Sequence, residues 1–114
     1  MPQYMFVLGG VTEEKRKAVE SKYEEINRKY AEWSERLFKG GHLKDAHKLR
    51  AMTGRRLVLK DGKILDGPFA ETKESIGGYY LIEAKNIEEA VELSKQCPTM
   101  LYQGGYVEVR EVEM

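Results

Sequence analysis

The sequence is poor in cysteine, since Cys97 is the only one among 114 residues. A single thiol excludes an intrachain disulfide and a four-cysteine zinc site. Cys97 stands close to the expected end of a helix, where the helix dipole disfavours a thiolate, so we interpret it as a buried structural thiol. Sparing use of cysteine fits a reducing compartment, and we expect a cytoplasmic protein.

The sequence also lacks long apolar runs and an excess of either charge. No run approaches the ~20 residues needed to span a bilayer, and the N-terminus has no basic, apolar leader. Lys plus Arg equals Asp plus Glu at 19 each, so nothing drives the chain toward nucleic acid or an anionic membrane. We expect neither as a partner. The absence of a phosphate loop, a dinucleotide fingerprint and a nucleophilic serine elbow leads us to expect no cofactor.

What remains is a globular composition, with 41% hydrophobic and 33% charged residues in one domain over residues 1–114. Periodicity predicts strands at residues 4–8, near 43–45, at 79–84 and at 106–112. Apolar runs at 56–60 and 63–65 flank Asp61-Gly62, which predicts a hairpin with a tight turn. A long helix is expected from the N-cap Thr12 to Gly40-Gly41. A second helix is expected to run from the N-cap Asn86, with Glu89 as its capping-box partner, to Pro98.

The long helix carries one apolar stripe, which we expect to pack on a sheet. The stripe consists of Val19, Tyr23, Ile26, Tyr30, Trp33 and Leu37. The order of elements predicts an α+β, ferredoxin-like split βαβ fold with an inserted β-hairpin. Right-handed crossovers place both helices on one face of the sheet. Because the strands at 4–8 and 79–82 are apolar on both sides, we expect a homodimer in which a second copy covers the other face, sheet to sheet.

Residues 66–78 form the most information-rich stretch. Pro68 fixes its own backbone and extends Gly67, so we expect a rigid turn in which Asp66 bonds backbone amides and Phe69 anchors the turn. The stretch then crowds carboxylates around Lys73. Crowding raises the pKa of a carboxyl group and a lysine lowers it, which is one way to make an acid or base that works near neutral pH. Alternatively, the stretch is purely structural.

Candidate site residues follow from this stretch and from one histidine. Asp66 and Glu71 are the candidate bases, and His47 is a candidate acid or base near the same turn. The candidate substrate-binding residues are Lys73, Phe69 and Glu74, with Lys73 holding an anionic group. A metal site at His42, Asp45 and His47 is disfavoured, because on a strand Asp45 and His47 share one face while His42 points the other way.

The motif DGPFAETKE at 66–74, followed by IGGY at 76–79, resembles the signature of the DGPF-domain branch of the YCII-related family of small bacterial proteins. Three further segments resemble the sequence pattern of the family: Asp61-Gly62-Lys63, Cys97-Pro98 and GGYVEVR at 104–110. The resemblance implies a dimeric α/β-barrel of ferredoxin-like subunits with a cleft beside the barrel. It also implies a His–Asp pair in the YCII branch. This sequence departs from that pair, because the long helix has no histidine and Cys97 stands where Asp is usual.

These observations predict a small dimeric protein with a ligand cleft near residues 66–78. If it is an enzyme, we expect cofactor-free proton transfer of the lyase or isomerase type on a small polar or aromatic metabolite. The alternative is a non-catalytic ligand-sensing or assembly module.

Overall fold

The computed structural model describes residues 1–10, 17–18, 20–50, 54–68 and 76–114. Their elements are, in chain order, β1 (Gln3–Gly9), the 3₁₀ turn η1 (Glu20–Lys22), α2 (Tyr23–Lys39), β2 (Leu43–Lys48), β3 (Arg55–Lys60), β4 (Lys63–Pro68), β5 (Gly78–Glu83), α3 (Ile87–Ser94), the 3₁₀ turn η2 (Pro98–Leu101) and β6 (Tyr106–Glu111). Four strands form an antiparallel sheet in the order β2-β5-β1-β6, while β3 and β4 form a separate two-stranded sheet. This α+β arrangement is compatible with the predicted ferredoxin-like fold.

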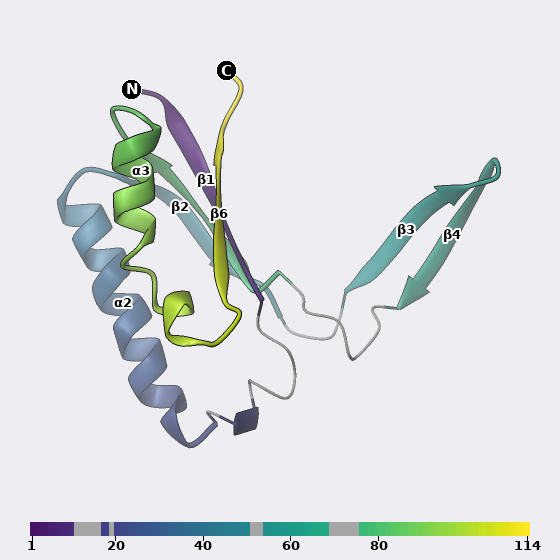
Figure 1. Cartoon of the computed structure of the whole chain (residues 1–114), viewed down its shortest axis with the longest axis horizontal. Helices are drawn as coiled ribbons and strands as arrows, with labels where there is room; N and C mark the ends of the chain where they lie inside the picture. Colours follow the sequence, from purple (N-terminus) through teal and green to yellow (C-terminus); the bar gives the residue numbers. More distant parts are fainter. Residues whose placement is uncertain (11–16, 19, 51–53, 69–75) are drawn as a thin grey trace.

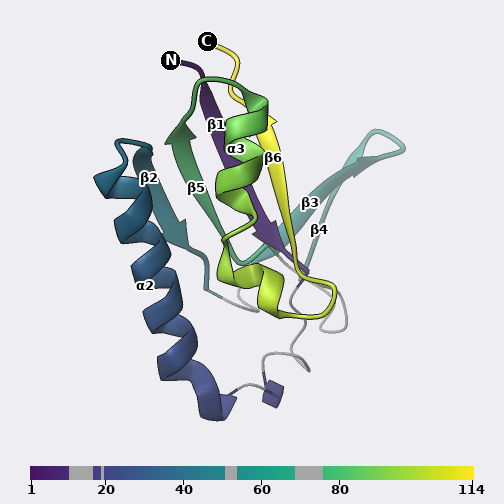
Figure 2. The ribbon, with the colours of Figure 1, turned by 60° about the vertical axis from the view of Figure 1, so that its left-hand side comes forward.

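Both helices lie on the same side of the four-stranded sheet (Figures 1 and 2). Burial therefore alternates from residue to residue along the strands. On β1, Tyr4, Phe6 and Leu8 are buried toward the helices, whereas Met5 and Val7 are only half-buried on the opposite side. The expectation that both faces of this strand are buried is therefore met, within one chain, only on the helix side. We call the opposite side the open face.

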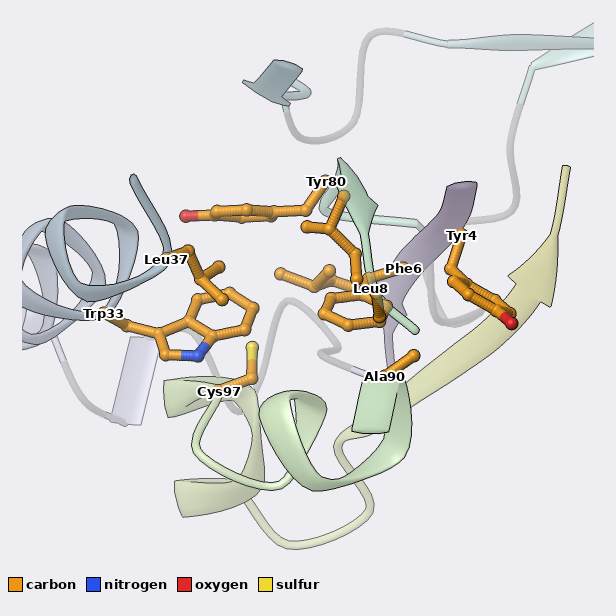
Figure 3. Packing of buried hydrophobic residues seen from close by; sticks show 10 residues of the cluster. Tyr4, Phe6, Leu8, Trp33, Leu37, Tyr80, Ala90 and Cys97 are labelled. Carbon is orange, nitrogen blue, oxygen red and sulfur yellow. The ribbon is translucent and has the colours of Figure 1, made fainter. Parts of the chain in front are cut away.

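Trp33 lies at the centre of the core between α2, the sheet and α3 (Figure 3). Its side chain is 1% exposed, its ring stacks on Phe6 at 6.1 Å and it meets Tyr80 at 4.5 Å. The indole Nε1–H donates to the Leu93 carbonyl at 3.2 Å, so the one polar group of the side chain is satisfied. The rest of the buried apolar cluster is Tyr4, Leu8, Leu37, Ile82, Ala84, Ala90 and Cys97. Burial of the Cys97 side chain matches the interpretation of a structural thiol.

The apolar stripe of α2 packs as predicted in its C-terminal half only. Tyr30, Trp33 and Leu37 face the core, but Tyr23 is 47% exposed. The expected N-cap Thr12 and the first stripe residue Val19 lie outside the described residues. The helix ends at the predicted glycines, because Gly41 adopts a φ of +79°, which favours glycine.

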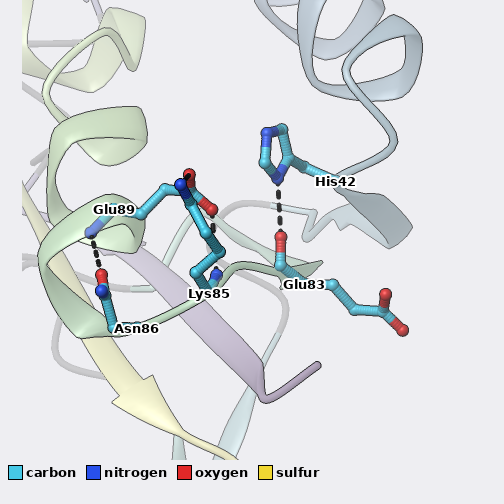
Figure 4. Close-up of polar contacts among 5 residues, drawn as sticks. All are labelled: His42, Glu83, Lys85, Asn86 and Glu89. Atoms are coloured by element: carbon cyan, nitrogen blue, oxygen red, sulfur yellow. Dashed lines mark hydrogen bonds and ion pairs between the residues drawn. The ribbon is translucent and has the colours of Figure 1, made fainter.

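The N-cap of α3 at Asn86 is confirmed, while the reciprocal bond of Glu89 goes to the amide of Lys85, one residue before the N-cap. Asn86 Oδ1 accepts a hydrogen bond from the Glu89 amide at 2.9 Å, and Glu89 Oε1 accepts one from the Lys85 amide at 2.9 Å (Figure 4). The first bond satisfies an amide that the first turn leaves without a partner, and the second ties the helix to the residue before the N-cap. The other end differs from expectation. The helix stops at Ser94, and Pro98 instead begins η2, a position where its missing N–H costs nothing.

The hairpin is confirmed and is longer than predicted. Asp61 and Gly62 have φ values of 52° and 76°, which is the geometry of the expected tight turn. However, β4 continues through Pro68, which pairs with Arg55 across the hairpin. The rigid turn expected at the start of the 66–78 stretch is therefore wrong for residues 66–68, which belong to a strand, and its expected anchor Phe69 lies outside the described residues. Proline is tolerated at the end of an edge strand, where no ladder N–H is needed, and the residue before it is extended in any case.

A close backbone contact beside η2 gives the first prediction. A Cβ on Gly105 would lie 2.2 Å from the Thr99 carbonyl oxygen, whereas one on Gly67 would meet nothing within 4 Å. Gly105→Ala should lower the free energy of unfolding by about 3 kcal/mol, because backbone must shift to admit the methyl group. Gly67→Ala, the matched control, should change it by less than about 1 kcal/mol. Urea unfolding followed by circular dichroism checks both, and equal midpoints for the two variants would contradict the packing described.

Candidate functional site

On the open face of the sheet, a cluster of polar side chains lies beside apolar side chains. Met5 on β1 pairs with Leu81 on β5, and Val7 pairs with Tyr79, so these four half-buried side chains share the face. The register of β2 against β5 shifts between Leu43 and Asp45. The strand also runs to Lys48 rather than ending near residue 45 as predicted. Beyond the shift, Asp45 pairs with Leu81 and His47 pairs with Tyr79.

The cluster consists of Asp45, His47 and Tyr79, and Asp45 joins the other two. The Tyr79 hydroxyl donates to Asp45 Oδ2 at 3.0 Å, and His47 Nε2 lies 3.3 Å from Asp45 Oδ1. The Ala46 amide donates to the same Oδ1 at 3.0 Å, which anchors the carboxylate to its own strand. The rings of His47 and Tyr79 lie 5.7 Å apart. One carboxylate therefore orients both an imidazole and a phenol on a rigid sheet.

This arrangement suits proton transfer. The hydrogen bond to Asp45, helped by desolvation, raises the pKa of the Tyr79 phenol, so at neutral pH the hydroxyl keeps its proton and acts as a donor. A carboxylate beside an imidazole fixes the ring and favours one tautomer, which is the usual way to prepare a histidine for acid/base work. His47 can then exchange a proton with a ligand through the ring nitrogen that Asp45 does not contact.

The cluster is open to water in the single chain. The side chains of His47 and Asp45 are 65% and 48% exposed. Proton-transfer sites gain strength when water is excluded, because electrostatic interactions strengthen in a low-dielectric setting. A covering layer on the open face would therefore change the chemistry of the cluster substantially.

The predicted site residues fall in different places. His47 lies in the cluster, and the strand placement that put Asp45 beside it is confirmed. Asp66 lies on β4, where its carboxylate accepts from Arg55 Nε at 3.1 Å and from Arg55 Nη2 at 2.5 Å. The other four candidates, Glu71, Lys73, Phe69 and Glu74, lie outside the described residues.

Two members of the cluster were missed as site residues. The alternation of Asp45 and His47 was a usable signal, because period-two spacing puts both on one face of a strand. Tyr79 carried no such signal, because its contact with Asp45 depends on β2 and β5 being neighbours, which local pattern does not reveal. His42 is separate, since its Nδ1–H donates to the Glu83 carbonyl at 2.7 Å (Figure 4).

In the described part of the chain, no three His, Cys, Asp or Glu side chains come together as a metal site. A shallow hollow lies at the start of α2 beside Ser21, Lys22 and Arg28, and it contains none of the predicted site residues. Among the helices in the described ranges, none has the length and apolar character needed to cross a bilayer.

Comparison with known proteins gives a family and one relative. The family model described as "YCII-related domain" matches residues 5–114. A protein of Rhizobium meliloti (strain 1021), "Uncharacterized protein R00369", is 37% identical over 51 residues, which is 45% of this chain and 41% of that protein. The chain thus spans about two fifths of the curated relative it matches.

Proposed function

This chain belongs to the YCII-related domain family, and on that premise we propose that it is a cofactor-free acid/base enzyme of the lyase or isomerase type. Its substrate would be a small polar or aromatic metabolite in the cytoplasm. The observation that carries the proposal is that Asp45 accepts a hydrogen bond from the Tyr79 hydroxyl and lies 3.3 Å from His47 Nε2. An imidazole held beside a carboxylate that a phenol also anchors is a positioned acid or base.

Each residue has a role in this proposal. His47 takes or gives the proton, and Asp45 orients it. The Tyr79 hydroxyl donates its one proton to Asp45 and so holds that carboxylate in place, while its oxygen can accept a hydrogen bond from a substrate. The 66–78 motif contributes from the segment that leads into β5, the strand whose second residue is Tyr79. For that segment the proposal keeps the roles suggested by the sequence, with Glu71 as a second base, Lys73 as the partner of an anionic group, and Phe69 and Glu74 as substrate-binding residues. Asp66 is the remaining candidate base, although its ion pair with Arg55 ties it to the hairpin.

We further propose that the chain belongs to the DGPF branch and forms a homodimer packed sheet to sheet, and that the second copy completes the site. The half-buried Met5, Val7 and Leu81 at the middle of the open face are the apolar surface that such an interface needs. A second copy seated there would exclude water from one side of the Asp45–His47–Tyr79 cluster and form the wall of a cleft. The result would be the dimeric α/β-barrel that the motif suggests.

A second candidate function is a non-catalytic ligand-sensing or assembly module. The observation that favours it is the Arg55–Asp66 ion pair, which gives the first residue of the motif a purely structural use. Under this alternative the cluster would bind a ligand without turning it over.

The test is a binding screen with matched variants. Wild-type protein, His47→Gln, Asp45→Asn and the distant surface variant Glu35→Gln are screened by thermal shift and NMR against small carboxylic and phenolic acids. We expect ligands to bind the wild type and Glu35→Gln alike, and at least tenfold more weakly to the two cluster variants. For any ligand that is turned over, His47→Gln should lower kcat by about 10²- to 10⁴-fold.

Three outcomes decide between the readings. Equal binding by all four proteins would remove the cluster from the function. Binding that depends on the cluster, with no turnover of any ligand, would favour the sensing module. In a parallel pair, Asp66→Asn and Lys73→Met test the motif: unchanged binding with lower stability in Asp66→Asn would assign Asp66 a structural role.

A further inference from the structure

The hairpin formed by β3 and β4, residues 54–68, is an arm that stands apart from the rest of the chain (Figure 1). The strands pair with each other and, among the described residues, with no other strand. The radius of gyration is 15.7 Å, against about 13 Å for a compact chain of this length. A two-stranded hairpin is marginally stable in water by itself. The arm therefore needs a surface to dock on.

One face of the arm is apolar and exposed. The register places Leu57, Leu59 and Ile64 on the same face, where they are 65%, 73% and 72% exposed. Three large aliphatic side chains at this exposure on one short ribbon mark an interaction surface rather than ordinary surface variation. The opposite face carries Val58 and Leu65, which are 45% and 49% exposed.

The position of the arm indicates what it meets. It follows β2 and precedes β5, which are neighbours in the sheet, and it extends on the side away from the helices (Figures 1 and 2). The arm and the open face therefore border the same space, and a partner seated on the open face comes within reach of the arm. This step rests on the proposed dimer, in which that partner is a second copy of the chain.

Area also favours use of the arm in a dimer. Strands about 4.8 Å apart, with a rise of about 3.4 Å per residue, give a face of roughly 400 Å² in plan for four strands of six residues. A standard interface takes about 800 Å² from each partner. The apolar face of the arm is an adjoining surface that can enlarge the interface beyond the four-stranded sheet.

We propose that the arm of each copy docks along β6 of the other copy. Two sheets stacked about a two-fold axis have two simple arrangements. An axis along the strands sets the β2 edge over the partner's β6 edge, whereas an axis across the strands sets β2 over the partner's β2. The arm connects β2 to β5 and so leaves the sheet at its β2 edge. The first arrangement therefore brings the arm to β6 of the partner, and the second brings it to β2 of the partner.

Charge distinguishes the two arrangements. The arm has a net charge of +2, from four Lys and Arg against two Asp, and the strip from residue 106 to 114 has −2, from three Glu against one Arg. Strand β2 has +1, from two Lys against one Asp. Docking on β6 is attractive and docking on β2 is repulsive. In addition, Lys60 and Lys63 pair directly opposite each other next to the turn of the arm, on the face that carries Val58 and Leu65, and this pairing repels unless carboxylates lie nearby.

The test measures dimer affinity in the full-length chain by sedimentation. Lys60→Glu/Lys63→Glu should raise the dimer Kd at least tenfold, and adding Glu111→Lys/Glu113→Lys to the same chain should restore it to within about threefold of wild type. Arg28→Glu/Lys39→Glu, the same charge change on α2, should leave it unchanged. An unchanged Kd in the arm variant, or no restoration by the β6 changes, overturns docking on β6.

Hydrogen exchange gives a second readout. Amides of residues 55–66 should be protected in the dimer and should exchange at least tenfold faster in a variant made monomeric at the open face. Equal protection in dimer and monomer, or free exchange in both, overturns the proposal, the latter pointing to a different partner. If the wild-type chain is a monomer, the proposed dimer is refuted. If the wild type is a dimer and the arm variants leave its Kd unchanged, only the docking of the arm is refuted.

Discussion

Replacing Leu81 with aspartate should turn the protein into a monomer. Leu81 lies half-buried on β5 at the middle of the open face, opposite Met5 on one neighbour and Asp45 on the other. A carboxylate there would have to be buried in the proposed interface, beside the Asp45 carboxylate. Removing a charge from water beside a like charge costs several kcal/mol, and about 3 kcal/mol already weakens a dimer by more than 100-fold.

The fold of this variant should survive, because the side chain points away from the Trp33 core. The matched control is Leu101→Asp on η2, which introduces the same charge at a position that is 62% exposed. It should remain a dimer. Light scattering gives the mass and circular dichroism the fold of each variant. A natively folded Leu81→Asp protein that dimerises with wild-type affinity would refute the sheet-to-sheet interface.

Replacing Trp33 with alanine should remove most of the stability of the domain. The indole is the contact through which α2, the sheet and α3 share one core, and its Nε1–H satisfies the Leu93 carbonyl. Truncation of a buried tryptophan to alanine costs about 3–5 kcal/mol, to which an unsatisfied carbonyl adds. Small domains have only about 5–15 kcal/mol in total.

Trp33→Phe is the graded control, because it keeps the aromatic contacts with Phe6 and Tyr80 but loses the hydrogen bond. Its loss should be clearly smaller than that of Trp33→Ala. Urea unfolding monitored by far-ultraviolet circular dichroism measures both changes. A loss below about 1 kcal/mol for Trp33→Ala would mean that the helices and sheet do not share the core described.

Much of the fold could be predicted because its signals are local. The Asp61-Gly62 turn, the N-cap at Asn86 and the helix stop at Gly41 each depend on a few neighbouring residues, and all three are present. The turn expected at 66–68 failed because the propensity of proline for turns was outweighed by pairing with β3. That pairing also placed Arg55 against Asp66, a contact across eleven residues that no local pattern encodes.

The candidate site was predicted in part for the same reason. The spacing of Asp45 and His47 put them on one face of a strand, and the structure brings them together. Their contact with Tyr79 required the strand order β2-β5-β1-β6 and a register shift after Leu43, both of which are set by tertiary pairing. The contact of Asp45 with Tyr79 therefore became visible only once β2 and β5 were known to be neighbours in the sheet.

The site, the cleft and the arm all depend on a second copy covering the open face. The molar mass of the unmodified chain at micromolar concentration, by light scattering or sedimentation equilibrium, tests that requirement most directly. The predicted mass is twice the 13.1 kDa of one chain. A mass of 13.1 kDa throughout the micromolar range would contradict it.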